Sequence, residues 1–124
     1  MKHNLDMFTV KVTDSIRTAM EKISVNHYRV AIVLDGNRVV GTASDGDIRR
    51  AILRDVLPIA PVEKIMNINC KTTTERDPAK QAEIIRREMV TVLPVVNADN
   101  ELVDVAVAYE PFAGPPEGTN DKPR

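Results

Sequence analysis

Two stretches of the chain repeat one pattern, and this repeat limits the possible folds more than any other feature. At an offset of 63 residues several apolar pairs coincide: Ile32-Val33 with Val95-Val96, and Val39-Val40 with Leu102-Val103. A turn lies between the pairs in each copy, and the helices before the turns overlay with Ala19 on Ala82. Internal repetition indicates one supersecondary unit that buries its apolar face against its neighbour.

Apolar spacing predicts a β-α-β-β-α order of elements. Alternating or continuous apolar residues favour strands, and apolar residues three or four positions apart favour amphipathic helices. Asp35-Gly36 favours a hairpin turn, and Pro78 suits the first turn of a helix. We expect strands at 8–12, 29–34 and 38–43 and helices at 15–25 and 48–55, then a strand at 70–74, a helix at 77–89 and strands at 92–96 and 101–107. The fold class is therefore α+β, or α/β in a looser scheme.

Prolines and polar residues mark the boundaries of the two units. Pro58 and Pro61 end the last helix of the first copy, and a short helical linker is expected at 62–66. The expected organisation is a first repeat at 6–57, a linker at 58–68, a second repeat at 69–112 and a tail at 113–124. Three prolines and two glycines in residues 114–124 favour a linker or a disordered end.

Charge and composition exclude several classes of function. The chain has 17 basic and 18 acidic residues, without the basic excess that is typical of nucleic-acid binding. Its single cysteine excludes an internal disulfide. The polar start lacks the apolar segment of a signal peptide, and the longest apolar run, residues 30–34, is too short for a membrane span. We therefore expect a cytoplasmic protein that binds neither nucleic acid nor membrane.

A short polar corner follows the hairpin of the first copy. Ser44 and Asp47 have the spacing of a capping box, in which each side chain accepts a hydrogen bond from the other residue's backbone N–H. The start of the next helix offers unpaired N–H groups and the positive end of a helix dipole, which favour a phosphate. Asp47 is placed to accept hydrogen bonds from the two hydroxyls of a ribose. The alternative is a helix cap without a ligand.

The pattern Gly41-x-x-Ser44-x-x-Asp47 after Val39-Val40 resembles the nucleotide motif of CBS (cystathionine-β-synthase) domains. The repeat over residues 6–107 resembles a tandem CBS pair, known as a Bateman module. Residues 45–50 are similar to the pairs attached to bacterial sugar-phosphate isomerases and sugar nucleotidyltransferases. The resemblance implies two small sheets that face each other across a pseudo-two-fold axis, nucleotides in the clefts between repeats, and a homodimer formed through the helices.

The resemblance assigns ligand contacts mainly to the polar corner. Gly41 is expected to allow close backbone approach, Ser44 to contact phosphate or ribose, and Asp47 to hold the ribose hydroxyls. Arg49 or Arg50 is expected to contact the phosphates. The full expected set is Thr13, Arg29, Val30, Gly41, Thr42, Ser44, Asp45, Asp47, Ile48, Arg49 and Arg50. The alternatives are solvated arginine side chains and simple helix caps. No catalytic or metal-binding residues are expected.

The second copy lacks this corner. The offset aligns the motif residues with unsuited ones: Gly41 with Asp104, Ser44 with Val107, and Asp47 with Glu110. Pro111 and the residues after it do not continue a helical pattern, so the second repeat is also expected to lack its last helix. Only one of the two clefts is therefore expected to bind a ligand.

The residues and the resemblance together predict a regulatory module without catalytic activity of its own. The expected ligand is AMP, ADP or ATP, with Mg²⁺ accompanying a polyphosphate, ahead of S-adenosylmethionine. Ligand binding would favour one orientation of the repeats, which an attached or partner domain detects. Two alternatives stay open. One is a structural dimerisation module that binds nothing, and the other is the N-terminal regulatory part of a sugar-phosphate nucleotidyltransferase with a C-terminal catalytic domain.

Overall fold

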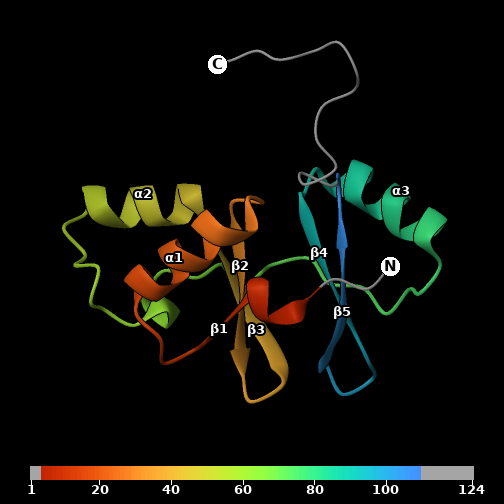
Figure 1. Cartoon of the computed structure of the whole chain (residues 1–124), viewed down its shortest axis with the longest axis horizontal. Helices are drawn as coiled ribbons and strands as arrows, with labels where there is room; N and C mark the ends of the chain where they lie inside the picture. The colour runs from red at the N-terminus through yellow and green to blue at the C-terminus, as the bar shows by residue number, and fades with distance from the viewer. Residues whose placement is uncertain (1–3, 110–124) are drawn as a thin grey trace, which may run out of the picture.

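The computed structural model describes residues 4–109. In chain order the elements are η1 (Leu5–Met7), β1 (Thr9–Lys11), α1 (Ile16–Asn26), β2 (Val30–Asp35), β3 (Arg38–Ser44), α2 (Asp45–Leu53), η2 (Val62–Lys64), α3 (Pro78–Glu88), β4 (Val92–Val96) and β5 (Leu102–Val107). Two hairpins lie at the centre, with α1 and α2 outside the first and α3 outside the second (Figure 1). The predicted α+β class is confirmed.

The two sheets differ in size. The first has the order β1-β2-β3, with β1 parallel to β2 and β3 antiparallel to β2. The second contains only β4 and β5, which are antiparallel. The predicted loss of the last helix in the second repeat and the predicted tail at 113–124 lie outside the described residues.

The predicted strand at 70–74 is wrong, because only a single bridge forms there. Thr73 pairs in parallel with Val95: its N–H donates to the Pro94 carbonyl at 3.0 Å, and its carbonyl accepts from the Val96 N–H at 2.8 Å. The preceding bond of this parallel ladder, to the Lys71 carbonyl, would need an N–H at position 94. Proline has none, so the ladder does not extend toward residue 70. On the other side the Glu75 N–H donates to Thr73 Oγ1 at 3.0 Å and leaves the ladder.

The two repeats do not correspond at a single offset. Three pairs of landmarks before the turns lie 62 residues apart: the helix N-caps Ser15 and Asp77, the left-handed C-caps His27 and Met89, and the bulged strand residues Val33 and Val95. Gly41, which pairs with Val33, and Asp104, which pairs with Val95, lie 63 residues apart in the sequence. The second turn therefore holds one residue more than the first. The predicted overlay of Ala19 on Ala82 is wrong, and Ala19 corresponds to Gln81.

The turn ends of the two hairpins meet at a pseudo-two-fold axis. Arg38 and Glu101 are equivalent residues, and they form an antiparallel bridge with each other. Two backbone hydrogen bonds flank this bridge, Val39 N–H to Asn100 O at 3.0 Å and Leu102 N–H to Asn37 O at 2.9 Å. Equivalent residues contact each other where a symmetry axis passes between them. The expected facing of the two sheets across such an axis is confirmed.

Apolar side chains join the layers. Along β2, Ala31 and Val33 face the helices, whereas Ile32 faces the second sheet, as the twofold period of a strand requires. The core between the sheets contains Phe8, Tyr28, Ile32, Val39, Val92, Val96 and Val105. Because both repeats contribute to this central core, neither buries its sheet without the other.

Candidate functional site

Reciprocal side-chain hydrogen bonds hold the polar corner between β3 and α2. Ser44 is the N-cap of α2, and its Oγ accepts from the Asp47 N–H at 3.1 Å. Asp47 Oδ2 accepts from the Ser44 N–H at 3.0 Å. The Asp45 N–H donates to the Arg29 carbonyl at 3.0 Å and ties the corner to the start of β2. The predicted capping box is confirmed, and it orients Asp47 before any ligand binds.

Asp47 also forms an ion pair with the next turn of α2. Its Oδ1 accepts from Nη2 of Arg50 at 2.8 Å, and its side chain is 18% exposed. Each carboxylate oxygen has two lone pairs, so both Asp47 oxygens retain room for a further donor. Two adjacent sugar hydroxyls are donors of the required kind. Arg50 places a positive charge beside them.

Gly41 allows the linker of the same chain to approach β3 closely. A Cβ at Gly41 would lie 3.0 Å from the Asn67 carbonyl oxygen and from Cγ and Sδ of Met66. Thr42 and Asn67 exchange backbone hydrogen bonds of 3.1 and 2.7 Å, which pair the linker with the free edge of β3. Gly41 therefore lets the linker lie against the strand that leads to the corner.

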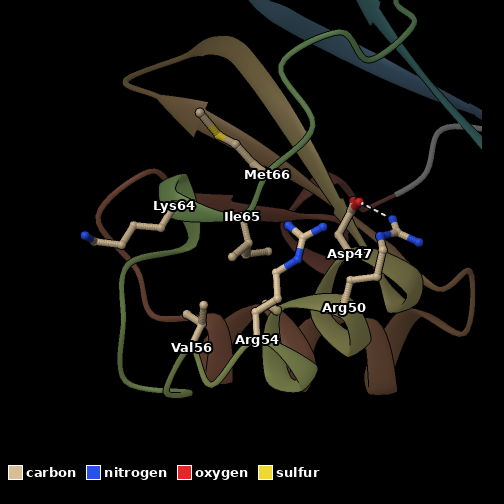
Figure 2. A pocket seen from close by; sticks show the side chains of 8 residues that line it. Asp47, Arg50, Arg54, Val56, Lys64, Ile65 and Met66 are labelled. Carbon is tan, nitrogen blue, oxygen red and sulfur yellow. Dashed lines mark hydrogen bonds and ion pairs between the residues drawn. The ribbon is translucent and has the colours of Figure 1, made fainter.

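A pocket of about 250 Å³ lies between α2 and this linker (Figure 2). It is lined by Asp47, Arg50, Ala51, Arg54, Val56, Lys64, Ile65 and Met66. Three of these residues belong to α2 and Arg54 is its C-cap; they recur three or four positions apart, so they share one face of the helix. Sequence reasoning identified Asp47 and Arg50 but missed Arg54, Lys64 and Met66. The helical spacing could have indicated Arg54, whereas the linker residues depend on a pairing that the sequence does not reveal.

The other predicted residues are dispersed. Arg29, Asp45 and Ile48 line a separate groove of about 440 Å³ between the end of α1 and the start of α2. Ile48 belongs to the buried core beneath α2, and Val30 packs against the core between the sheets. Thr13 and Arg49 are exposed and line neither cavity. The structure thus brings Asp47 and Arg50 together in one pocket and does not bring the whole predicted set together.

Aromatic side chains occupy the equivalent corner of the second repeat. The Ala108 N–H donates to the Thr91 carbonyl at 2.9 Å, which repeats the backbone bond of the first corner. Next to it, the Tyr109 ring lies 5.3 Å from the Tyr28 ring, and the Tyr28 hydroxyl donates to the Tyr109 carbonyl at 2.8 Å. Phe8 lies 5.3 Å from the other side of this pair. The backbone geometry is thus retained, but Val107 stands at the position of Ser44, and the position of Asp47 lies outside the described residues.

Metal binding, thiol reactivity and membrane insertion are three other kinds of chemistry that residues 4–109 could support. These residues hold no group of three or more His, Cys, Asp or Glu side chains that could bind a metal ion. Burial raises the pKa of the Cys70 thiol above that of a free cysteine, which disfavours a nucleophilic thiolate. Within the same range, every helix is too short or too polar to cross a membrane.

Comparison with known proteins identifies the first repeat. Residues 1–54 match the sequence model of the CBS domain. They belong to the CBS domain family. A CBS domain is a regulatory module and not a catalytic one. The chain is also 30% identical over 95 residues to the arabinose 5-phosphate isomerase GutQ of Escherichia coli. This match covers 75% of the chain but only 30% of that protein's length.

Solved structures extend the CBS fold over both repeats. The CBS domains of a transcriptional regulator from Streptococcus pneumoniae align with a TM-score of 0.72 at 17% identity, over 92% of this chain and 94% of that one. The CBS domain protein PAE2072 from Pyrobaculum aerophilum, complexed with AMP, aligns with a TM-score of 0.66 at 23% identity, over 86% and 87%. At these identities the likeness concerns the fold alone. The chain has the fold of a CBS pair.

Proposed function

We propose that this chain senses an adenine nucleotide, bound at the corner between β3 and α2, and controls an attached or partner domain. The observation that carries the proposal is Asp47, which a capping box orients toward a pocket in a CBS domain. A structural neighbour with AMP supports the ligand class. AMP, ADP or ATP is favoured over S-adenosylmethionine, and Mg²⁺ would accompany a di- or triphosphate.

Each residue of the corner has a defined role in this proposal. Asp47 accepts hydrogen bonds from the ribose hydroxyls, and Ser44 contributes its hydroxyl to phosphate or ribose. Arg50 lines the pocket and adds positive charge near the phosphates, whereas Arg49 does not line it. The positive end of the α2 dipole favours the same anion. One nucleotide binds per chain, because the second corner carries aromatic residues instead.

The linker provides a route from the ligand to the second repeat. Met66 lines the pocket, and the next residue, Asn67, is paired with Thr42 of β3. A ligand that contacts Met66 and Asp47 together favours one position of the linker relative to α2. The chain then continues into the second repeat, so a shift of the linker changes how the repeats are oriented. A tenfold preference of the ligand for one orientation corresponds to about 1.4 kcal/mol.

Calorimetric titration with AMP, ATP and S-adenosylmethionine tests the proposal. Asp47→Asn keeps a side-chain oxygen that can cap Ser44 but removes the charge. We expect its AMP affinity to fall about ten- to a hundredfold, because a hydrogen bond to a charged group contributes about 1.5–3 kcal/mol. The matched control is Asp55→Asn, an exposed carboxylate at the other end of α2. Equal AMP affinity in wild type and Asp47→Asn, or no binding of any nucleotide, would refute the proposal.

A second candidate function is structural dimerisation with another copy of this chain. The end of α2 and the loop after it expose several large apolar side chains, Ile52, Leu53, Leu57 and Ile59, of which Ile59 is 79% exposed. Large apolar side chains exposed within one short segment favour a protein partner. Leu53→Lys should convert a dimer to a monomer in sedimentation velocity, whereas Met89→Lys on α3 should not. A wild-type monomer at high concentration would exclude this function.

The attached enzyme is a separate question. The GutQ match favours a sugar-phosphate isomerase, and the sequence of residues 45–50 is also similar to pairs in sugar-phosphate nucleotidyltransferases. The domain composition of the full-length gene product distinguishes these two alternatives. An isomerase domain before these residues supports the first alternative, and a nucleotidyltransferase domain after them supports the second.

A further inference from the structure

Arg54 and Lys64 are the two cations of the pocket without a carboxylate partner in the described part of the chain. Arg50 is paired with Asp47 at 2.8 Å, so its charge is largely neutralised. Within residues 4–109 no ion pair or side-chain hydrogen bond involves the Arg54 guanidinium or the Lys64 ammonium. The pocket therefore has three cations and one carboxylate, and two of the cations are free for an anionic ligand.

Arg54 is an exposed residue, and its guanidinium extends over the pocket. Figure 2 shows it rising from α2 into the space between Ile65 and Asp47, while the Lys64 ammonium points outward from the rim. A guanidinium matches two oxygens of a phosphate at once, which an ammonium cannot do. Arg54 is thus placed to receive a phosphate, with Asp47 on the same face of α2 to receive hydroxyl groups.

The size of the pocket limits what it can hold. Its volume of about 250 Å³ is below the range of roughly 300–1,000 Å³ that is typical of small-molecule sites. A sugar with one phosphate is of the right order for this volume, and the other parts of a nucleotide would extend beyond the pocket. Ala51, Val56, Ile65 and Met66 supply apolar walls for the ring of the sugar.

We propose that this pocket binds a phosphorylated pentose, with its hydroxyls on Asp47 and its phosphate on Arg54. The inference rests on the proposed function and makes Arg54, rather than Arg50, the main phosphate contact. The pentose phosphate is either part of a nucleotide such as AMP or a free sugar phosphate. Phosphates beyond the first extend past the rim into solvent and add little affinity.

Titration calorimetry on the whole chain tests this inference with three probes: adenosine, AMP and ribose 5-phosphate. Arg54→Gln should weaken AMP binding about ten- to a hundredfold, as expected for the loss of a charge-assisted phosphate contact. It should leave adenosine binding unchanged. Arg49→Gln removes the same charge from the same helix outside the pocket, and it should leave the affinity for AMP within about twofold of wild type. Arg54→Lys should recover part of the loss, since it restores charge but not the bidentate geometry.

The three probes separate failure of this inference from failure of the nucleotide proposal. If adenosine and AMP bind equally well, or if Arg49→Gln weakens AMP as much as Arg54→Gln does, the phosphate assignment is wrong while nucleotide sensing stands. If ribose 5-phosphate binds in an Arg54-dependent manner but adenosine and AMP do not, nucleotide sensing is wrong and the pocket takes a free sugar phosphate. If none of the three binds, both are wrong.

Discussion

Asn26 offers a demanding test of how the first repeat positions its candidate site. Its side chain is completely buried at the end of α1. Its Nδ2 donates to the carbonyls of Met7 at 3.0 Å and Val30 at 3.1 Å, and its Oδ1 accepts from the Tyr28 N–H at 2.7 Å. One amide thereby joins η1, the end of α1 and the start of β2. It also fixes the turn that carries Arg29, whose carbonyl receives the Asp45 N–H.

The expected cost of Asn26→Ala follows from these three bonds. The substitution removes a partner from two carbonyls and one N–H, and a buried polar group left without a partner costs about 1–3 kcal/mol. Water can enter part of the space vacated, so we expect a loss of about 3–5 kcal/mol. A domain of this size has a total stability of about 5–15 kcal/mol, so the loss is a large share of it.

Urea denaturation measures this loss. With a slope of about 1–3 kcal/mol per molar urea, the midpoint should fall by about 2 M. Asn69→Ala, at an exposed asparagine just after the linker, is the matched control and should change the free energy of unfolding by less than about 0.5 kcal/mol. A decrease below about 1 kcal/mol in Asn26→Ala would show that the three bonds do not anchor the turn.

Two further predictions concern the linker and the thiol. Gly41→Ala should lower the free energy of unfolding by about 1–3 kcal/mol in urea denaturation, because the new Cβ lies 3.0 Å from the Asn67 carbonyl oxygen. Gly46→Ala, at the half-buried start of α2, should cost less, because its Cβ would meet only the flexible end of the Arg50 side chain. Burial raises the pKa of Cys70, so less thiolate is present at a given pH than in a free cysteine. Its alkylation by iodoacetamide at pH 8 should be slower than that of glutathione and become faster as pH rises; equal rates at pH 8 would contradict this.

Local interactions account for what the sequence predicted correctly. The capping box at Ser44 and the helix start at Asp77 depend on residues within one turn of a helix, so spacing alone identified them. The third strand of the second sheet failed for a nonlocal reason, since the ladder stops at Pro94 of another strand. The extra residue in the second turn was missed because Val95 and Val96 are both valines, and either one aligns with Val33.

The candidate site was only half predictable for the same reason. Asp47 and Arg50 belong to a local motif, whereas the pocket beside them exists because Asn67 pairs with Thr42, 25 positions away in the chain. Nothing in the composition of residues 62–67 indicates that pairing. Arg54 lines a pocket only because the linker lies beside this end of α2, so its own sequence position does not indicate a site.

The asymmetry of the two corners argues for one ligand per chain. Both corners keep one backbone hydrogen bond, in which an N–H just after the second strand of the hairpin donates to a carbonyl just before the first strand. The Asp45 N–H donates to the Arg29 carbonyl, and the Ala108 N–H donates to the Thr91 carbonyl. That bond belongs to the fold and needs no particular side chain. The side chains that accept from a sugar or cap a helix occur only at the first corner, among the described residues. Because the backbone bond is kept where the serine is not, packing alone explains the geometry of the second corner, and the proposed ligand binding is assigned to the first.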